Sequence, residues 1–434
     1  MATQPKAPQS GGNRIQADAR RITRLSETLA LSEGQRWLAR EKSWVNEKHL
    51  DLCRIPAPTF FERQRAEWFR DQLQALNWHA ELDAAGNVLA AFKSPERKAA
   101  IVLSAHLDTV FAPRRMEDVY AAPDGRLIGP GVADNGPGLS ALLTFARLFS
   151  ENSGLHSIAN SLLIVANVGE EGEGNLSGMR HLFGRQTGIG DVDSIKAVIV
   201  LDGPSTDHVT TQALASRRFE LNFAGPGGHS WNDYGTPNPV HALADAIAGF
   251  IQAAEGRAGA GKTLCSYSFG VIEGGITINS IPASARAKLD MRSDDSVVLD
   301  ELAALLTSAV ERGLEHENRV ARLGKLSAKI KELGSRPGGR LPDDSPLLRT
   351  IQAVDSVLGI RSRVNCASTD ANVPLSMGLP AVAIGAGGQG GGAHTDHEWF
   401  QPDSRDLGLR RVLLLLAALL DEEIPSEPVR SPQA

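Results

Sequence analysis

The chain has 434 residues, with 45 Lys+Arg against 51 Asp+Glu and a formal net charge of −6. Its 42% hydrophobic and 22% charged residues are typical of a folded protein and exclude a mostly disordered chain. Basic residues form no run longer than a pair such as Arg217-Arg218, so no surface is suited to neutralising phosphates and we expect no nucleic-acid partner.

The predicted elements begin after a tail. Residues 1–14 are rich in Pro, Gly, Gln and Ser without an apolar period, and residues 425–434 are similar, so we expect both segments to be disordered. Residues 15–46 are charged and helical in character. A second helical stretch, residues 62–76, follows a proline break.

The first part of a catalytic domain is predicted at residues 15–210. Short apolar runs that are typical of buried strands alternate with longer helical stretches such as residues 137–149. This alternation predicts an α/β fold with a doubly wound, mostly parallel sheet. The predicted strands are residues 100–104, 162–167, 197–201 and 381–384.

The pattern changes between residues 211 and 335. Strands and helices follow there in the order βαββαβ, which predicts a small sandwich domain inserted into the larger one. The second part of the catalytic domain is expected at residues 336–424. The predicted strands of the insertion are residues 218–223, 263–272, 283–292 and 326–333, and its helices are residues 239–253 and 297–314.

No membrane segment or disulfide framework is predicted. The longest apolar run, residues 412–420, is about half as long as a bilayer span and is expected to form a buried terminal helix. The first residues contain no continuous apolar stretch of the secretory kind. Cys53, Cys265 and Cys366 lie far apart in the sequence, so a reducing, cytoplasmic location is expected.

Most strands of the larger domain end in a carboxylate or a histidine. His106 and Asp108 close the first run, and residues two apart share one face of a strand. The carboxyl ends of strands in open α/β sheets are where sites lie. The further strand-end and loop positions of this kind are Asp134 in GPGVADNGPG, Glu170 and Glu171 in NVGEEGEG, Asp202 in AVIVLDG and His394 in GGGAHTDHEWF.

Carboxylates gathered in this way repel one another unless they are protonated or bind a cation. Two or more cations such as Zn²⁺ would relieve that repulsion. Taken singly, each residue is more often a cap, a surface charge or a core histidine than a ligand. Glu170 and Glu171 are adjacent, and the side chains of consecutive residues seldom point to the same place. We therefore expect the two glutamates to have different roles. One of them is expected to ligate metal and the other to carry a proton.

The motifs SAHLDTVF, GPGVADNGPGL, VGEEGEGNLSG, LDG and a late His-x-x-x-Glu, in this order, resemble a two-zinc metallopeptidase family. That family includes peptidase T, carboxypeptidase G, carnosinase, aminoacylase and succinyl-diaminopimelate desuccinylase, and peptidase T-like members are the most similar. The resemblance covers about residues 50–420. It implies the zinc-peptidase fold and two Zn²⁺ per chain, with Co²⁺ or Mn²⁺ able to substitute.

The resemblance also implies residue roles. Asp134 would bridge both metals, and the peptide bond that follows it would be cis. Asp108 would orient His106, and Glu170 would be the general acid/base. The implied metal ligands are His106, Asp134, Glu171, Asp202 and His394.

The insertion resembles the lid or dimerisation domain of the family. GPGGHSWNDYG matches a segment whose histidine, here His229, reaches substrate, in many members across a homodimer interface. GGITINSIPASARAKLDMR matches a segment whose Asn279 and Arg292 would bind the carboxylate or carbonyl of the substrate. Alternatively, Asn279 is a turn residue and Arg292 a surface ion pair.

The first functional hypothesis is a two-metal exopeptidase of the aminopeptidase, tripeptidase or dipeptidase type. It would cleave an amide bond of a short peptide with metal-activated water and Glu170 as general acid/base. The alternative is an N-acyl or N-carbamoyl amino acid amidohydrolase, because both reactions hydrolyse an amide beside a carboxylate. A non-catalytic metal-binding scaffold would require a missing ligand or base, and the motifs lack none.

Overall fold

The computed structural model describes residues 10–93, 99–184, 189, 192–255 and 265–421. The chain divides into two compact units, Met1–Ala213 with Gly339–Ala434 (unit 1) and Leu214–Gly338 (unit 2). The tail expected at residues 425–434 and the first nine residues of the N-terminal tail lie outside the described residues. Residues 10–14 differ from the expectation, because helix α1 (Ser10–Ser26) already includes them. Once its first turn has formed, a helix gains a hydrogen bond for each further residue, which extends it beyond the region where an apolar period is visible.

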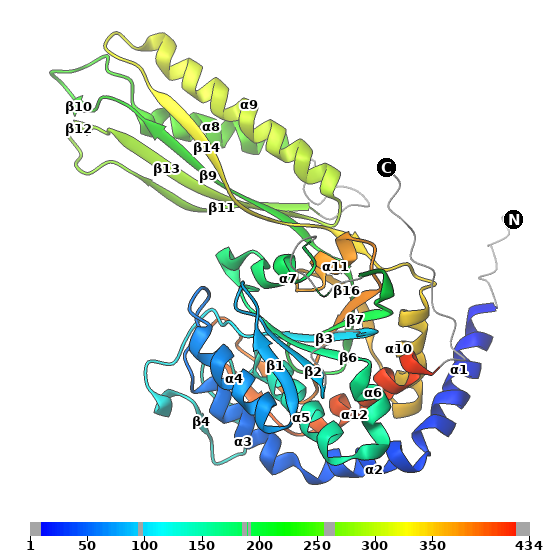
Figure 1. Ribbon diagram of the computed structural model, residues 1–434. Helices are drawn as coiled ribbons and strands as arrows, with labels where there is room; N and C mark the ends of the chain where they lie inside the picture. Colours follow the sequence, from blue (N-terminus) through cyan, green and yellow to red (C-terminus); the bar gives the residue numbers. More distant parts are fainter. Residues whose placement is uncertain (1–9, 94–98, 185–188, 190–191, 256–264, 422–434) are drawn as a thin grey trace, which may run out of the picture. The chain divides into compact units, whose positions relative to one another are not determined.

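A large mixed sheet forms the centre of unit 1 (Figure 1). Its strand order is β1-β2-β6-β3-β7-β17-β8-β15, with β16 paired to β8. The central strands β6, β3, β7 and β17 run parallel, and β1 and β2 add antiparallel pairs at one edge. The predicted α/β fold with a mostly parallel central sheet is therefore confirmed. The strands are β1 (Trp78–Leu82), β2 (Val88–Phe92), β3 (Ile101–His106), β6 (Leu162–Asn167), β7 (Ala197–Leu201), β8 (His208–Ala213), β15 (Gly339–Arg340), β16 (Arg363–Ala367) and β17 (Ala381–Ile384).

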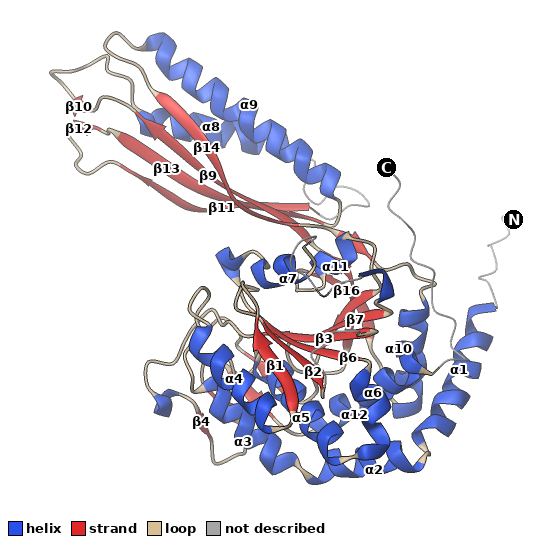
Figure 2. Ribbon diagram, viewed as in Figure 1, coloured by secondary structure: helices blue, strands red, loops and turns tan. Residues whose placement is uncertain are grey.

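Helices cover this sheet (Figure 2). Every residue of β2, β3, β6, β7 and β17 is buried, as expected for strands that are covered on both faces. The longer helices are α2 (Leu29–Arg40), α3 (Lys42–Cys53), α4 (Arg63–Ala75), α5 (Gly136–Glu151), α10 (Pro346–Leu358) and α12 (Arg405–Leu420), and the shorter ones are α6 (His156–Asn160), α7 (Ser177–Leu182) and α11 (Asn372–Ser376).

The apolar run at residues 412–420 lies in α12, where most of its side chains are buried against the core of unit 1. Among the described residues, no helix is both long and apolar enough to span a membrane.

A second, small antiparallel sheet of unit 1 connects loops that are far apart in the sequence. It consists of β4 (Tyr120–Ala121), β5 (Leu127–Ile128), β18 (Gln389–Gly391) and β19 (Trp399–Gln401), in the order β18-β19-β5-β4. Trp399 pairs with Ile128 in its register. This pairing draws the segment that follows β5, with Asp134, towards the loop between β18 and β19, which carries His394.

Unit 2 contains an antiparallel sheet of order β11-β13-β9-β14 with helices α8 and α9 packed on it (Figure 2). The predicted βαββαβ succession is present, although residues 263–264 of the predicted second strand lie outside the described residues. A two-stranded ribbon, β10 with β12, projects from this framework. The elements are β9 (Ala215–Ala224), β10 (Gly228–His229), α8 (Pro239–Ala254), β11 (Cys265–Gly274), β12 (Ser280–Ile281), β13 (Ser284–Ser293), α9 (Ser296–Val320) and β14 (Ser327–Arg336).

Candidate metal centre

The predicted ligands of unit 1 come from strand ends and loops at one edge of the central sheet. His106 is the last residue of β3, and Asp202 directly follows β7. Glu171 follows β6 by four positions in a loop. Because β3, β6 and β7 are parallel neighbours, their carboxyl ends meet at this edge.

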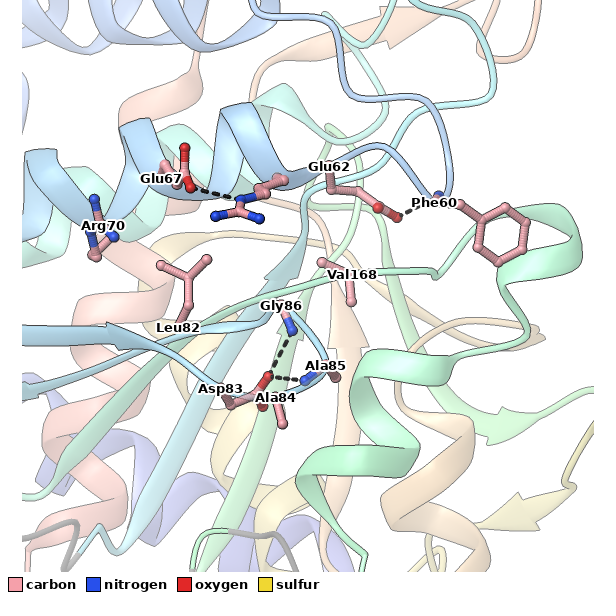
Figure 3. A pocket seen from close by; sticks show the side chains of 11 residues that line it. Phe60, Glu62, Glu67, Arg70, Leu82, Asp83, Ala84, Ala85, Gly86 and Val168 are labelled. Carbon is pink, nitrogen blue, oxygen red and sulfur yellow. Dashed lines mark hydrogen bonds and ion pairs between the residues drawn. The ribbon is translucent and has the colours of Figure 1, made fainter.

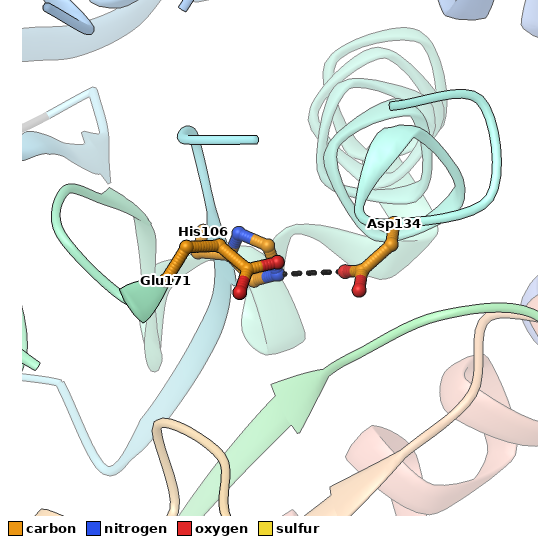
Figure 4. A group of neighbouring side chains, drawn as sticks. All are labelled: His106, Asp134 and Glu171. Carbon is orange, nitrogen blue, oxygen red and sulfur yellow. Dashed lines mark hydrogen bonds and ion pairs between the residues drawn. The ribbon is translucent and has the colours of Figure 1, made fainter. Parts of the chain in front are cut away.

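Asp134 lies between two histidine rings. His106 Nε2 is 3.0 Å from Asp134 Oδ1, and His394 Nε2 is 3.2 Å from Asp134 Oδ2. His394 Nε2 also lies 2.8 Å from Glu171 Oε1. Figure 4 shows the first of these contacts, with Glu171 beside the His106 ring. Asp134 thus offers one carboxylate oxygen to each of the two imidazoles.

The ligand atoms of His106, Asp134 and Glu171 all lie within 4.8 Å of one another. Asp202 extends this group, because its Oδ1 is 4.0 Å from His106 Nε2. Burial, together with the nearby charge of Asp134, raises the pKa of Asp202 to about 6. The structure therefore gathers all five predicted ligands of unit 1 around His106 and Asp134.

The charges of these groups depend on one another. Burial opposes protonation of His106, yet hydrogen bonds to Asp108 and Asp134 hold its pKa well above the usual value. Hydrogen bonds to Asp134 and Glu171 raise the pKa of His394 to about 10. Burial alone would raise the pKa of Asp134, but the two histidines lower it. His106, His394 and Asp134 thus stabilise one another's charged forms.

The loop of Asp134 is secured on both sides. The peptide bond Asp134-Asn135 is cis, as the resemblance implies. The side chain of Asn135 donates to Leu201 O at 2.7 Å and accepts from Gly203 N–H at 3.1 Å, which connects this loop to the end of β7 on either side of Asp202. Asn135 also accepts from Gly138 N–H at 3.2 Å and so caps α5.

Asp108 supports both His106 and the glutamate pair. Its Oδ1 accepts the backbone N–H of Glu170 at 2.9 Å, and its Oδ2 accepts that of Glu171 at 2.8 Å. Thr59 donates to the same Oδ2 at 2.9 Å. His106 Nδ1 lies 2.9 Å from the backbone O of Asp108 and 3.6 Å from Oδ1. Asp108 is fully buried, so it fixes His106 and the Glu170-Glu171 loop in one arrangement.

Glu398 is a structural part of the centre to which the sequence reasoning gave no role. Its carboxylate accepts three backbone N–H groups, from Gly131 at 2.8 Å, Ala133 at 2.7 Å and Asp134 at 2.8 Å. Burial raises its pKa to about 7 against the opposing effect of these hydrogen bonds. The late His-x-x-x-Glu spacing was the available signal, because Glu398 is four residues after His394.

Glu62 is a second acid to which the sequence reasoning gave no role, and it contacts the backbone directly before Glu170. Glu62 Oε1 accepts the N–H of Gly169 at 3.2 Å and that of Phe60 at 3.0 Å. It also lines a cavity of about 460 Å³ beside Val168 (Figure 3). None of the predicted site residues lines this cavity.

The three predicted substrate residues belong to unit 2. His229 ends β10 and Asn279 directly precedes β12, and Ser230 N–H donates to Asn279 O at 3.1 Å. His229 Nδ1 accepts Trp231 N–H at 3.2 Å. Arg292, on β13, donates to Asp290 Oδ2 at 2.8 Å. Their roles towards substrate stay predictions.

Comparison with known proteins agrees with this organisation. A model of the peptidase family M20/M25/M40 matches residues 102–418. A probable carboxypeptidase of Aspergillus clavatus is 27% identical over 283 residues, which are 60% of this chain and 60% of the relative. The cytosol non-specific dipeptidase of Escherichia coli is 26% identical over 310 residues, which are 63% of this chain and 58% of the relative. The matched segments thus span only 58–60% of the length of these curated relatives.

The fold is also similar to solved structures. A tripeptidase of Staphylococcus aureus superposes with a TM-score of 0.68 at 18% identity, covering 87% of this chain and 98% of the other. At this identity the likeness concerns the fold.

Proposed function

Since the chain belongs to peptidase family M20/M25/M40, we propose that it is a metal-dependent hydrolase that cleaves an amide bond of a short peptide. The observation that carries this proposal is Asp134, whose two oxygens lie 3.0 Å from His106 Nε2 and 3.2 Å from His394 Nε2. A scaffold without catalysis would not need a proton carrier, yet Glu170 is present in the loop beside the ligand Glu171.

Two divalent cations fit this donor set. His106 and Asp202 would hold one cation, and Glu171 and His394 would hold the other. Asp134 would contribute to both sites. Imidazole nitrogens with carboxylate oxygens suit Zn²⁺, and they also accept Co²⁺ or Mn²⁺. Such metals supply Lewis acidity, which polarises a carbonyl group and makes water more acidic.

The residues of the chain would do the remaining work. Glu170 would take a proton from the attacking water and return it to the leaving amine. Its position depends on Asp108, which accepts its backbone N–H at 2.9 Å. Burial of Glu170 and Glu171 limits competing water around the reacting groups.

A short peptide with a free terminus is the substrate class that we propose, of the aminopeptidase, tripeptidase or dipeptidase kind. The support comes from the dipeptidase, tripeptidase and carboxypeptidase activities named for the similar proteins. Arg292 and Asn279 would bind the carboxylate or carbonyl of the substrate, as the resemblance implies.

We also propose a homodimer in which unit 2 takes part and His229 assists catalysis. The support is a group of large exposed apolar side chains near His229 on and beside the β10–β12 ribbon, which a lone chain would leave in water. They are Trp231, Tyr234, Ile276 and Ile278. A cytoplasmic location is proposed as well, because Cys53, Cys265 and Cys366 lie far apart in the sequence and suggest no disulfide framework.

The test is a substrate panel with added Zn²⁺, Co²⁺ or Mn²⁺. Di- and tripeptides are compared with N-acetyl and N-carbamoyl amino acids, and each reaction is repeated with excess chelator. We expect turnover of peptides that disappears with chelation. Turnover of the N-substituted amino acids alone would establish the amidohydrolase alternative, and turnover of neither set would contradict the proposed hydrolase.

A further inference from the structure

Asp370 is a fully buried acid in the turn between β16 and α11, outside the predicted ligand set. The turn is closed by its own side chains. Thr369 N–H donates to Asn372 Oδ1 at 2.9 Å, and Ala371 N–H donates to Thr369 Oγ1 at 3.2 Å. Residue 370 is therefore held firmly, and its carboxylate has one defined environment.

The groups around Asp370 provide little stabilisation for the negative charge of its carboxylate. Asn167 Nδ2 donates to Asp370 Oδ2 at 2.6 Å. The other oxygen, Oδ1, has no hydrogen-bond partner among the described residues, and neither does Asn167 Oδ1. No Lys or Arg of the described chain is paired with Asp370 in an ion pair. An ionised carboxylate that is buried in this way is costly unless positive charge lies within reach.

The positive charge within reach belongs to the metal centre. Asn167 is the last residue of β6, and the sheet register places it opposite His106. Its backbone O accepts Leu107 N–H at 2.7 Å, next to His106 in the chain. The groups whose charges act on Asp370 include His106, Asp202 and Asp108, while burial raises its pKa to about 7.

Building on the proposed function, we infer that Asp370 is a positioning residue of the metal centre. Asp370 is hydrogen-bonded to Asn167, which lies opposite His106 in the sheet register, and its negative charge increases the affinity of the centre for divalent cations without ligating them. A cation at His106 gains attraction to this charge across an interior of low dielectric constant, and the carboxylate gains a larger countercharge than protonated His106 supplies. From this we expect a contribution of about tenfold in metal affinity.

The substitution Asp370→Asn removes the negative charge and keeps the shape of the side chain. The amide has the size of the carboxylate, and its oxygen can still accept from Asn167. In a second variant, Asp370→Asn is combined with Asn167→Asp, which restores the charge on the other partner of the same hydrogen bond. The probe is Co²⁺, titrated at pH 8 into metal-free full-length protein and followed by visible absorption, so no substrate is needed.

We expect wild type and Asp370→Asn to bind the same number of Co²⁺ ions, with about tenfold weaker affinity in the variant. The double variant should regain most of the loss. Equal affinity in wild type and Asp370→Asn overturns the inference. A double variant that is as weak as Asp370→Asn also overturns it, because shape and not charge would then matter. Wild-type protein that binds no Co²⁺ would instead refute the proposed function.

Thermal unfolding of the metal-free proteins supplies the control for stability. Protonated His106 and the hydrogen bond from Asn167 offset the cost of burying this charge only in part, so its removal should leave the melting temperature of metal-free Asp370→Asn equal to that of the wild type or higher. The increase in melting temperature on adding Co²⁺ should be smaller in the variant. A lower melting temperature of the metal-free variant, or failure to fold, would show that Asp370 serves the fold and would overturn the inference.

Discussion

His394 Nε2 lies 2.8 Å from Glu171 Oε1, although the two residues are 223 positions apart in the sequence. The contact depends on two separate pieces of architecture. Glu171 is held where β6 ends in the central sheet, and His394 is held between β18 and β19 in the small sheet. This contact helps to stabilise a protonated imidazole, because hydrogen bonds to Asp134 and Glu171 together raise the pKa of His394 to about 10. A metal bound by His394, as we propose, would compete with the proton for the same nitrogen.

Metal binding should release protons. In the metal-free protein at pH 8 we expect a proton on His394, whose pKa is raised to about 10, and on His106, whose pKa is also raised. We expect about two protons to leave when the centre fills, and about one in His394→Ala. Calorimetric titration with Zn²⁺ in buffers of different ionisation enthalpy measures this number. Binding heats that are independent of the buffer would contradict the prediction.

The two adjacent glutamates should respond differently to the same substitution. Glu171→Gln is expected to lose affinity for one metal, because it weakens the oxygen that faces His394. Glu170→Gln is expected to keep both metals and substrate binding while turnover falls by several orders of magnitude. Elemental analysis and single-turnover kinetics of the two variants provide the comparison. Equal metal loss in both would show that the division of roles is wrong.

Asp108→Ala should be strongly destabilising. It leaves the buried N–H groups of Glu170 and Glu171 without an acceptor, at about 1–3 kcal/mol each in the free energy of unfolding. Metal affinity should fall by about 10- to 100-fold, because His106 and the glutamate loop lose their common support. Urea unfolding and metal titration measure the two effects. Thr59→Val is the matched control, since it removes one hydrogen bond to the same carboxylate and should cost only about 1 kcal/mol.

Stability should change with pH in opposite directions with and without metal. The folded-state pKa values of Asp202, Asp370 and Glu398 are raised to about 6, 7 and 7. At pH values between the unfolded-state pKa values of these groups and their raised folded-state pKa values, the folded chain binds more protons than the unfolded chain. The free energy of unfolding of the metal-free protein should therefore fall as pH rises from about 5 to 8.

The metal-loaded protein should behave oppositely, because metal binds more tightly once the ligands have lost their protons. Urea unfolding from pH 5 to pH 8, in chelator and in excess Zn²⁺, measures both trends. Parallel curves in the two conditions would be inconsistent with the charges described for the centre.

The proposed role of His229 across a dimer can be tested by complementation. His229→Ala and Glu170→Gln should each be nearly inactive, with unchanged metal content in the first. If His229 acts in the partner's site, mixed dimers regain activity, because one of their two sites combines an intact Glu170 with an intact His229. Wild-type turnover of His229→Ala would make this residue structural. Inactivity of both variants without recovery in verified mixed dimers would place His229 in the site of its own chain.

Several elements could be predicted from local sequence. The predicted and observed bounds agree for β6, β7 and β17. These strands are buried on both faces, so their burial requires a continuous apolar run that is visible in the sequence. The hairpin β1–β2 was not predicted. Its turn depends on Asp83, whose Oδ1 accepts N–H groups of Ala85, Gly86 and Asn87, and on pairing of β2 with the distant β6.

By itself, the sequence determined the α/β architecture, the inserted sandwich and the candidate ligands, because apolar periodicity and the residue types at strand ends are local properties of the chain. Only the tertiary structure decided how those ligands are held. Glu398 reaches the N–H of Asp134 across 264 positions, and Asp370 reaches Asn167 across 203. The physical reason is that the role of a buried carboxylate is set by whichever N–H groups and charges folding brings next to it. Chain spacing does not record those neighbours.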